Sequence, residues 1–298
     1  MMQNAWHTPV MPNEVIGYLN LAFGNCVVDC TMGVGGHAVL IAEKIGTEGR
    51  IIGLDRDSGS LAIARENMKV IGTHCDYIHA DYRHIDQVLA QLGTREVDGM
   101  LFDLGISSFQ LNDPERGFSF RLDGPLDMRI DKEAGISAYD LVNSLSQQEI
   151  AAILKKYGQE RLSNRIARYL VERRLQAPIV STRDLRDIVL RALPRAATRQ
   201  KIHPATRTFQ AIRIAVNREL ESLDVALEKS IGCLKQGARI CVVSFHSLED
   251  KIVKEKFRYF SRQGKIKLIV KKPLRPQEEE VNSNSRARSA RLRVAEKI

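Results

Sequence analysis

The sequence has few cysteines and no long apolar run, and these absences exclude several classes of protein. The five cysteines include no Cys-x-x-Cys pair and no two close Cys/His pairs of the kind that bind zinc. We therefore expect reduced thiols in a cytoplasmic protein and no metal site. No run of roughly 18 apolar residues is present, which argues against a membrane span. The first residues also lack the basic and apolar regions of a secretory signal.

Basic residues are abundant, and their excess lies in one segment. The whole chain of 298 residues carries a formal charge of +9. Between Lys155 and Arg213 there are 15 lysines and arginines but only 4 acidic residues, a net charge of +11. This concentration indicates a polyanionic partner that binds one part of the chain, although a solvated basic face is the alternative.

The amino-terminal third alternates between strand and helix patterns. We expect strands at 26–30, 50–54, 77–79 and 99–102, and helices at 37–45, 58–68 and 85–92. This order is typical of a parallel, doubly wound α/β sheet. The pattern returns near the carboxyl end, with strands at 238–243, 267–270 and 291–295 and a helix capped by Ser247, with Asp250 three residues later.

Between these parts the strands stop. Residues 111–136 show no periodicity, and a segment of this length is usually functional or disordered. Helices follow at 147–158 (with a capping box from Ser146 to Glu149), 161–175 and 182–193, and a longer one begins near Pro204 and extends to Leu220. We therefore expect an α/β domain formed by residues 1–110 and 216–298, with a basic helical insert at 111–215 that recognises the substrate.

A glycine-rich turn follows the first expected strand. Gly33-Val34-Gly35-Gly36-His37-Ala38 matches G-x-G-x-x-G/A, and Asp55 ends the next strand. Small residues let a ligand approach the backbone, the helix start attracts an anion, and the carboxylate can accept hydrogen bonds from ribose hydroxyls. Nicotinamide dinucleotide sites and S-adenosylmethionine sites share this layout, and a tight turn that binds nothing is a further reading.

Two acidic residues favour S-adenosylmethionine. Asp29 lies inside the first strand, where it could hold the amino group of a methionine moiety, whereas a dinucleotide site prefers an apolar residue there. Asp103 ends the fourth strand and would face the crevice at the carboxyl ends of the strands. Tyr82 follows the third strand and could stack on adenine or be an ordinary, partly buried tyrosine.

Six longer motifs resemble the RsmH/MraW family, bacterial enzymes that methylate N4 of a cytidine in small-subunit ribosomal RNA. The motifs are Gly35-Gly36-His37, Asp103-Leu104-Gly105-Ile106-Ser107-Ser108, Arg116-Gly117-Phe118-Ser119-Phe120, Asp123-Gly124-Pro125-Leu126-Asp127-Met128-Arg129, His203-Pro204-Ala205-Thr206-Arg207-Thr208-Phe209-Gln210 and Ser244-Phe245-His246-Ser247-Leu248-Glu249-Asp250. The likeness runs from residue 7 to residue 289. The sequence departs from the family at Phe109, where proline is common, and in the segment 261–285, which is shorter than in some relatives.

The resemblance implies a class I, Rossmann-like S-adenosylmethionine methyltransferase sheet with an inserted all-helical domain. It implies that the cofactor is S-adenosyl-L-methionine and that the partner is the small ribosomal subunit or its 16S rRNA, and a homodimer is left open. The family's cofactor contacts correspond here to Gly35, Gly36, His37, Asp55, Tyr82, Asp103 and Gln110.

Asp103 is the candidate catalytic residue, because a carboxylate that accepts a hydrogen bond from the cytosine amino group would increase electron density on N4. The alternative is that Asp103 serves only the cofactor. Phe118 or Phe120 could stack on the target base or pack under the insert. Arg129 and Arg207 could bind phosphate or pair with Asp123 and Asp127. RNA backbone contacts are expected from seven arginines of the insert: Arg165, Arg168, Arg173, Arg174, Arg191, Arg195 and Arg199.

Further contacts and rival functions remain open. Four arginines near the carboxyl end could form a second RNA contact, or their charges could prevent another chain from pairing with an edge strand of the sheet: Arg286, Arg288, Arg291 and Arg293. Rival functions are an NAD(P)-dependent oxidoreductase, a non-catalytic RNA-binding protein and a DNA amino-methyltransferase. The last usually carries an Asp/Asn/Ser-Pro-Pro-aromatic tetrad, where this chain has Asp103-Leu104-Gly105-Ile106.

Overall fold

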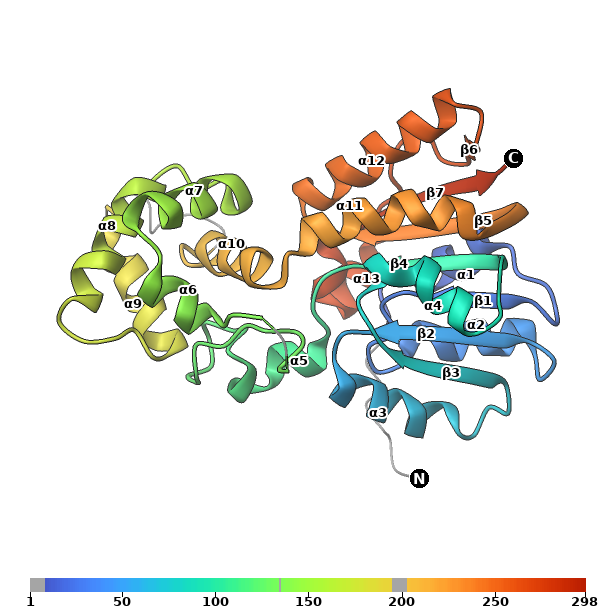
Figure 1. Cartoon of the computed structure of the whole chain (residues 1–298), viewed down its shortest axis with the longest axis horizontal. Coiled ribbons are helices and arrows are strands. Elements are labelled where there is room, and N and C mark those ends of the chain that lie inside the picture. The colour runs from blue at the N-terminus through green and yellow to red at the C-terminus, as the bar shows by residue number, and fades with distance from the viewer. Residues whose placement is uncertain (1–8, 134, 195–202) are drawn as a thin grey trace. The chain divides into compact units, whose positions relative to one another are not determined.

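The computed structural model describes residues 9–133, 135–194 and 203–298, which form two compact units (Figure 1). The first unit consists of the chain up to Gly105 together with Leu220–Ile298, and the second unit is Ile106–Glu219. The structural boundaries thus lie a few residues from the expected ones, so that residues 106–110 and 216–219 fall in the second unit. No helix among the described residues is both long enough and apolar enough to cross a membrane.

The first unit is built on a seven-stranded sheet in the order β3-β2-β1-β4-β5-β7-β6. Strands β1 to β5 run parallel to one another, whereas β7 is antiparallel to both β5 and β6. The expected α/β, Rossmann-like sheet is therefore confirmed. The strands are β1 (Cys26–Asp29), β2 (Arg50–Asp55), β3 (His74–His79), β4 (Val97–Asp103), β5 (Leu234–Ser244), β6 (Ile266–Leu268) and β7 (Arg291–Lys297).

Helices cover both faces of this sheet. Successive strand residues point to opposite faces, so the adjacent Val27 and Val28 belong to different apolar cores. One core includes side chains from α4, α11 and α12, and the other includes side chains from α1, α2 and α3. Burial on both faces explains why the strands read as continuous apolar runs. The helical elements of this part are α1 (Pro12–Leu19), α2 (Gly36–Ile45), α3 (Ser58–Met68), η1 (Tyr82–His84), α4 (Ile85–Gln91), α11 (Glu219–Ser230), η4 (Ile231–Cys233), α12 (Ser247–Arg262), α13 (Glu278–Ser283) and η5 (Ser285–Ser289).

The described residues of the second unit are mainly helical and have an apolar core of their own. Ser146 forms the expected capping box with Glu149, and Ser137 and Ser181 form two more with Asp140 and Asp184. The helices are α5 (Ser108–Asn112), η2 (Pro114–Arg116), α6 (Ala138–Ser144), α7 (Gln147–Gly158), α8 (Ser163–Arg174), α9 (Thr182–Ala192) and α10 (Thr206–Asn217).

The aperiodic segment between η2 and α6 is held by side chains that bind its backbone. The buried Arg116 donates to the carbonyl oxygen of Ile130 at 2.7 Å. From α10, the buried Asn217 donates to the carbonyl of Met128 and accepts from the amide of Ile130. Gly124 passes so close to Pro114 that a Cβ atom there would lie 2.0 Å from the carbonyl oxygen. These contacts order a segment whose described residues form no helix or extended strand.

Two of the differences from the predicted helix boundaries have a clear local cause. The helix expected to extend to Leu220 ends at Asn217, because Arg218 adopts a left-handed conformation with φ 51°, and α11 begins at Glu219. The helix expected to be capped by Ser247 is capped instead by His246, whose side chain accepts from the amide of Glu249.

One of the two alternatives for the carboxyl-terminal arginines, that they protect an edge of the sheet, is wrong for β7. This strand lies between β5 and β6, so it is not a sheet edge. Arg291 and Arg293 instead form ion pairs with Asp250 at 2.9 and 2.7 Å. Arg286 and Arg288 precede the strand, in η5.

Candidate active site

Three carboxylates lie at the carboxyl ends of three adjacent strands. Asp55 ends β2, Asp29 ends β1 and Asp103 ends β4, and these strands are neighbours in the sheet. The chain order reverses direction at β1, which pairs with β2 on one side and with β4 on the other. Ligands of open α/β sheets bind outside the carboxyl ends of the strands at this switch point. The three carboxylates, which come from separate segments of the sequence, therefore lie at the edge of the sheet where we expected the site.

The glycine-rich turn joins β1 to α2 at the same edge. Gly35 caps α2 with φ 90°, a left-handed conformation that a side chain would strain. Gly36 and His37 then form the first turn of the helix. The amides of a first helical turn have no partners within the helix and attract negative charge, such as a carboxylate of a ligand. The amide of Gly33 donates to Oδ2 of Asp55 at 2.7 Å and so ties the turn to β2.

Burial makes the three carboxyl groups hard to ionise. It raises the pKa of Asp29 and of Asp103 to about 7, and that of Asp55 to about 6. The charges of Asp55 and Asp103 further raise the pKa of Asp29. A ligand that carries positive charge would relieve both the repulsion and the lost hydration. These three carboxyl groups therefore fit S-adenosylmethionine, which has a positively charged sulfonium, an ammonium group and two ribose hydroxyls that can donate hydrogen bonds.

A hydrogen bond from its backbone amide fixes the position of Asp103, but one oxygen of its carboxylate has no hydrogen-bond partner among the described residues. Its amide donates to Oγ1 of Thr31 at 2.6 Å, which fixes the end of β4 against the turn. Oδ1 is buried and has no hydrogen-bond partner among the described residues. Oδ2 lies 3.5 Å from Nδ1 of His37, and the side chain as a whole is 24% exposed. An unsatisfied buried oxygen disfavours the charged form, so this carboxylate is a stronger base than an exposed one.

Tyr82 lies just beyond the carboxyl end of β3, in η1, and packs edge-on against Phe102 with ring centroids 5.6 Å apart. Its predicted contact with a cofactor stays a prediction. The neighbouring Asp81 was not among the predicted site residues, yet its Oδ2 lies 2.8 Å from Arg83, 3.5 Å from Arg56 and 3.1 Å from the Ser222 hydroxyl. The sequence signal that could have drawn attention to it is an acid directly before Tyr82 at a strand end.

Gln110 belongs to the second unit, where its side chain closes a helix cap. Its Oε1 accepts from the amide of Ser107 at 2.9 Å, while its own amide donates to the Ser107 hydroxyl. The neighbouring Phe109, at the position where the family often has proline, is 40% exposed. The predicted role of Gln110 as a cofactor contact stays a prediction.

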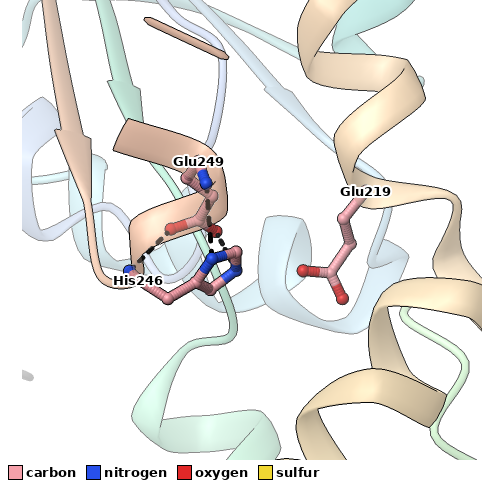
Figure 2. A group of neighbouring side chains, drawn as sticks. All are labelled: Glu219, His246 and Glu249. Atoms are coloured by element: carbon pink, nitrogen blue, oxygen red, sulfur yellow. Dashed lines mark hydrogen bonds and ion pairs between the residues drawn. The ribbon is translucent and has the colours of Figure 1, made fainter. Parts of the chain in front are cut away.

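His246 and Glu249 form a reciprocal cap at the start of α12 (Figure 2). The carboxylate of Glu249 accepts from the amides of Phe245 and His246, and Nδ1 of His246 accepts from the amide of Glu249. The third residue drawn, Glu219, makes a bidentate ion pair with Arg213 in the second unit. Sequence reasoning assigned His246 no role, and the structure gives it this local one.

The aromatic residues of the aperiodic segment lie in the core of the second unit. Phe118 is 5% exposed, and Phe120 stacks on His203 with centroids 4.4 Å apart. These contacts favour packing over the alternative of stacking on a target base. Arg129 forms an ion pair with Asp127, which is the alternative to phosphate binding that the sequence left open. Asp123 forms an ion pair with Arg183.

The arginines expected to bind RNA divide into two groups. Arg173 and Arg174 donate to the backbone carbonyls of Ala177 and Val142, so they stabilise the helical unit itself. Of these seven arginines, Arg165, Arg168 and Arg191 are exposed. Arg195 and Arg199 lie outside the described residues.

Comparison with known proteins gives matches along the whole chain. Residues 4–298 match the family described as the MraW methylase family. A protein named ribosomal RNA small subunit methyltransferase H from Geobacter sp. is 46% identical over 312 residues, covering 100% of both chains. The protein of that name from Caldicellulosiruptor saccharolyticus is 44% identical and covers 98% of this chain and 99% of its own. A solved structure of a putative rRNA methylase from Clostridium thermocellum covers 96% of this chain and 93% of its own, with 14% identity and a TM-score of 0.47.

Proposed function

Because this chain belongs to the MraW methylase family, we propose that it transfers a methyl group from S-adenosylmethionine to N4 of a cytidine in the decoding region of 16S rRNA. Its relatives are named for the small-subunit ribosomal RNA on which they act. The enzyme is an S-adenosylmethionine-dependent methyltransferase. The family match removes the dinucleotide oxidoreductase and the non-catalytic RNA-binding protein as rival readings.

The observation that carries this proposal is the set of three carboxyl groups around the glycine-rich turn, of which Asp29 is buried and Asp55 and Asp103 are partly buried. Asp55 would accept hydrogen bonds from the ribose hydroxyls of the cofactor, and Asp29 would balance the positive charge of its ammonium group. The backbone amides at the start of α2, at Gly36 and His37, would face the carboxylate of its methionine moiety. Once bound, S-adenosylmethionine supplies a methyl group activated by its attachment to a positive sulfur. The protein must bind and orient the target amine and accept its proton.

Asp103 would orient the target amine and take its proton. The lone pair of a cytosine amino group is delocalised into the ring, so the group is a weak nucleophile. A hydrogen bond accepted by Oδ2 of Asp103 would hold the amine in line and localise that lone pair. Correct orientation can contribute about 7–11 kcal/mol to such a reaction, and a general base a further factor of about 10²–10⁴.

The second unit would bind the RNA. Its basic segment carries the charge excess, and the exposed Arg165, Arg168 and Arg191 are suited to phosphate contacts. Such contacts supply affinity that depends on salt but do not select a base. The target base must leave its stack before it can reach a methyl donor. We place this reaction in the cytoplasm, on the small subunit or on its 16S rRNA.

The test uses isotope-labelled S-adenosylmethionine with small subunits and 16S rRNA from cells that lack the protein. Duplex DNA is the control substrate, and the products are digested to nucleosides for identification. Label in N4-methylcytidine from the subunit or its rRNA is expected, and the preferred form identifies the substrate. Label only in DNA or in another nucleoside would overturn the substrate assignment. Light scattering on the same preparation distinguishes a monomer from a homodimer.

A further inference from the structure

The imidazole of His37 is held between a backbone carbonyl and the carboxyl group of Asp103. Its Nε2 lies 3.0 Å from the carbonyl oxygen of Val10, and its Nδ1 lies 3.5 Å from Oδ2 of Asp103. The ring is 5% exposed. The carbonyl cannot easily turn away, because the next amide, that of Met11, donates to Glu280 at 2.6 Å and Val10 itself is buried. The orientation of the ring is therefore fixed from both sides.

This arrangement selects one tautomer of the neutral ring. A carbonyl oxygen can only accept, so Nε2 must carry the proton that is donated to Val10. Nδ1 is then a bare acceptor that faces Asp103. Two acceptors repel each other when Asp103 is ionised, but a protonated Asp103 can donate to Nδ1. The geometry thus stabilises the pair once Asp103 has taken up one proton.

The charges around the pair have opposing effects. Burial lowers the pKa of His37, and the negative charges of Asp29 on β1 and Glu280 on α13 act against this change. Arg286 on η5 lowers the pKa of Asp103, whereas burial and the charge of Glu249 on α12 raise it. Burial thus favours the uncharged form of both groups, in which a proton on Asp103 can be donated to Nδ1 of His37.

We propose that His37 is a positioning residue: its Nδ1 accepts a hydrogen bond from Asp103 once that carboxylate has taken the proton of the substrate amine. This inference rests on the proposed function. As N4 bonds to the methyl carbon, the carbon–sulfur bond breaks and its electron pair stays on sulfur. One N4 proton bonds to Oδ2 of Asp103, and the N–H electron pair remains on nitrogen. The protonated carboxyl group then donates a hydrogen bond from Oδ2 to Nδ1 of the neutral His37, which stabilises it.

The proton later returns to water through Asp103, whose side chain is partly exposed. The separation of 3.5 Å needs to shorten by only a few tenths of an ångström, as catalytic hydrogen bonds commonly do when substrate binds. His37 thus has a chemical role through its side chain, in addition to the cofactor contact that the family resemblance assigns to its position.

The first test observes the pair directly in the full-length protein without cofactor. Long-range proton–nitrogen NMR spectra of protein with labelled histidine show which ring nitrogen is protonated, and His37→Gln identifies the signal. We expect an Nε2-protonated ring whose titration midpoint falls in Asp103→Asn, because a neighbouring negative charge is lost. Asp98→Asn, at the opposite end of β4, is the control and should leave the midpoint unchanged. A ring protonated at Nδ1, or a midpoint insensitive to Asp103→Asn, would overturn the proposal.

The second test separates chemistry from structure. His37→Gln can keep a donor toward Val10 but lacks the Nδ1 acceptor, so cofactor Kd should stay within about twofold while kcat falls by about ten- to a hundredfold. A kcat equal to that of the wild type would sink the proposal. If the wild type methylates no rRNA but the NMR coupling is present, the proposed function fails and the hydrogen-bonded pair stands.

Discussion

The guanidinium of Arg116 donates to the carbonyl of Ile130 across a stretch of chain that contains no regular secondary structure. The same nitrogen lies 3.1 Å from the carbonyl oxygen of Arg129, and the arginine is 4% exposed. One buried side chain thus binds the far end of the aperiodic segment back to η2. The motif that contains Arg116 was identified from the sequence by resemblance, and the structure gives it a mechanical role.

We predict that Arg116→Met loosens this segment without affecting the first unit. Two partly buried backbone carbonyls would lose this donor, and an unsatisfied buried group costs about 1–3 kcal/mol. Hydrogen–deuterium exchange should therefore accelerate in peptides from residues 111–136 and stay unchanged in peptides from β1, β2 and β4. Arg161→Met, at an exposed position of the same unit, is the matched control. Equal exchange in both variants would show that Arg116 does not hold the segment.

The elements that the sequence predicted well are those with a strong local signal. The strands β1, β2 and β4 and the helix α2 are marked by apolar runs and by glycines at turns, and Ser146 marks the start of α7 through its capping box. The cofactor edge was also predictable, because acids at the ends of parallel strands must meet at one side of the sheet. Local pattern and topology together led to Asp29, Asp55 and Asp103.

The features that escaped prediction depend on contacts between distant parts of the chain. The break at Arg218 directly follows Asn217, whose side chain binds the backbone at residues 128 and 130. Asp250 was assigned to a helix cap because the sequence does not reveal its partners on β7. The pairing of His37 with Val10 and Asp103 likewise joins three separate segments, and no spacing rule shows it.

Asp103 should give the reaction a pH dependence that Asp98 does not. The carboxylate is the form that accepts a proton, and burial raises its pKa to about 7. In the wild type, kcat/KM should therefore rise with pH through a midpoint near 7 and level off above it, as expected for a base of the free enzyme. Asp103→Asn should lose this limb and about 10²–10⁴-fold in turnover while it retains cofactor affinity.

The control, Asp98→Asn, changes a carboxylate at the amino end of β4, where Asp98 pairs with Lys235 away from the site edge. It should keep the wild-type pH profile. If Asp103→Asn loses cofactor affinity and turnover by the same factor, a role in cofactor binding alone accounts for Asp103. Isothermal titration with S-adenosylmethionine and initial rates between pH 5 and pH 9 decide between these outcomes.

Asp250 should stabilise the first unit above acidic pH. It joins α12 to β7 through Arg291 and Arg293, and these arginines hold its pKa below the usual value despite burial. A lowered pKa in the folded state gives stability that is present above the unfolded pKa and is lost as the pH falls through the folded pKa. Asp250→Asn should cost about 3–5 kcal/mol at neutral pH, because it leaves Arg293 buried without its partner.

Urea denaturation at pH 7 and in acid measures this effect. The difference in unfolding free energy between Asp250→Asn and the wild type should shrink as the pH falls, since the wild-type carboxyl also becomes neutral. Lys251→Ala removes an exposed charge from the same helix and should change stability by less than about 1 kcal/mol. A difference that is constant with pH would mean that packing, and not the ion pairs, accounts for the loss.

The exposed arginines of the second unit should account for much of the salt dependence of RNA binding. A variant with Arg165, Arg168 and Arg191 changed to alanine loses three charges that can contact phosphates. Each phosphate contact to a single strand contributes about 0.7 to the slope of log K against log[salt], so the slope should decrease in magnitude by about 2. Fluorescence anisotropy with a 16S rRNA fragment at several salt concentrations measures the slope.

A variant with Lys251, Arg258 and Lys267 changed to alanine removes the same charge from exposed positions of the first unit and should retain nearly the wild-type slope. Equal losses in the two variants would assign the effect to the net charge of the protein. A loss confined to the first variant would assign it to the basic face of the second unit, which is the RNA-binding surface proposed for it.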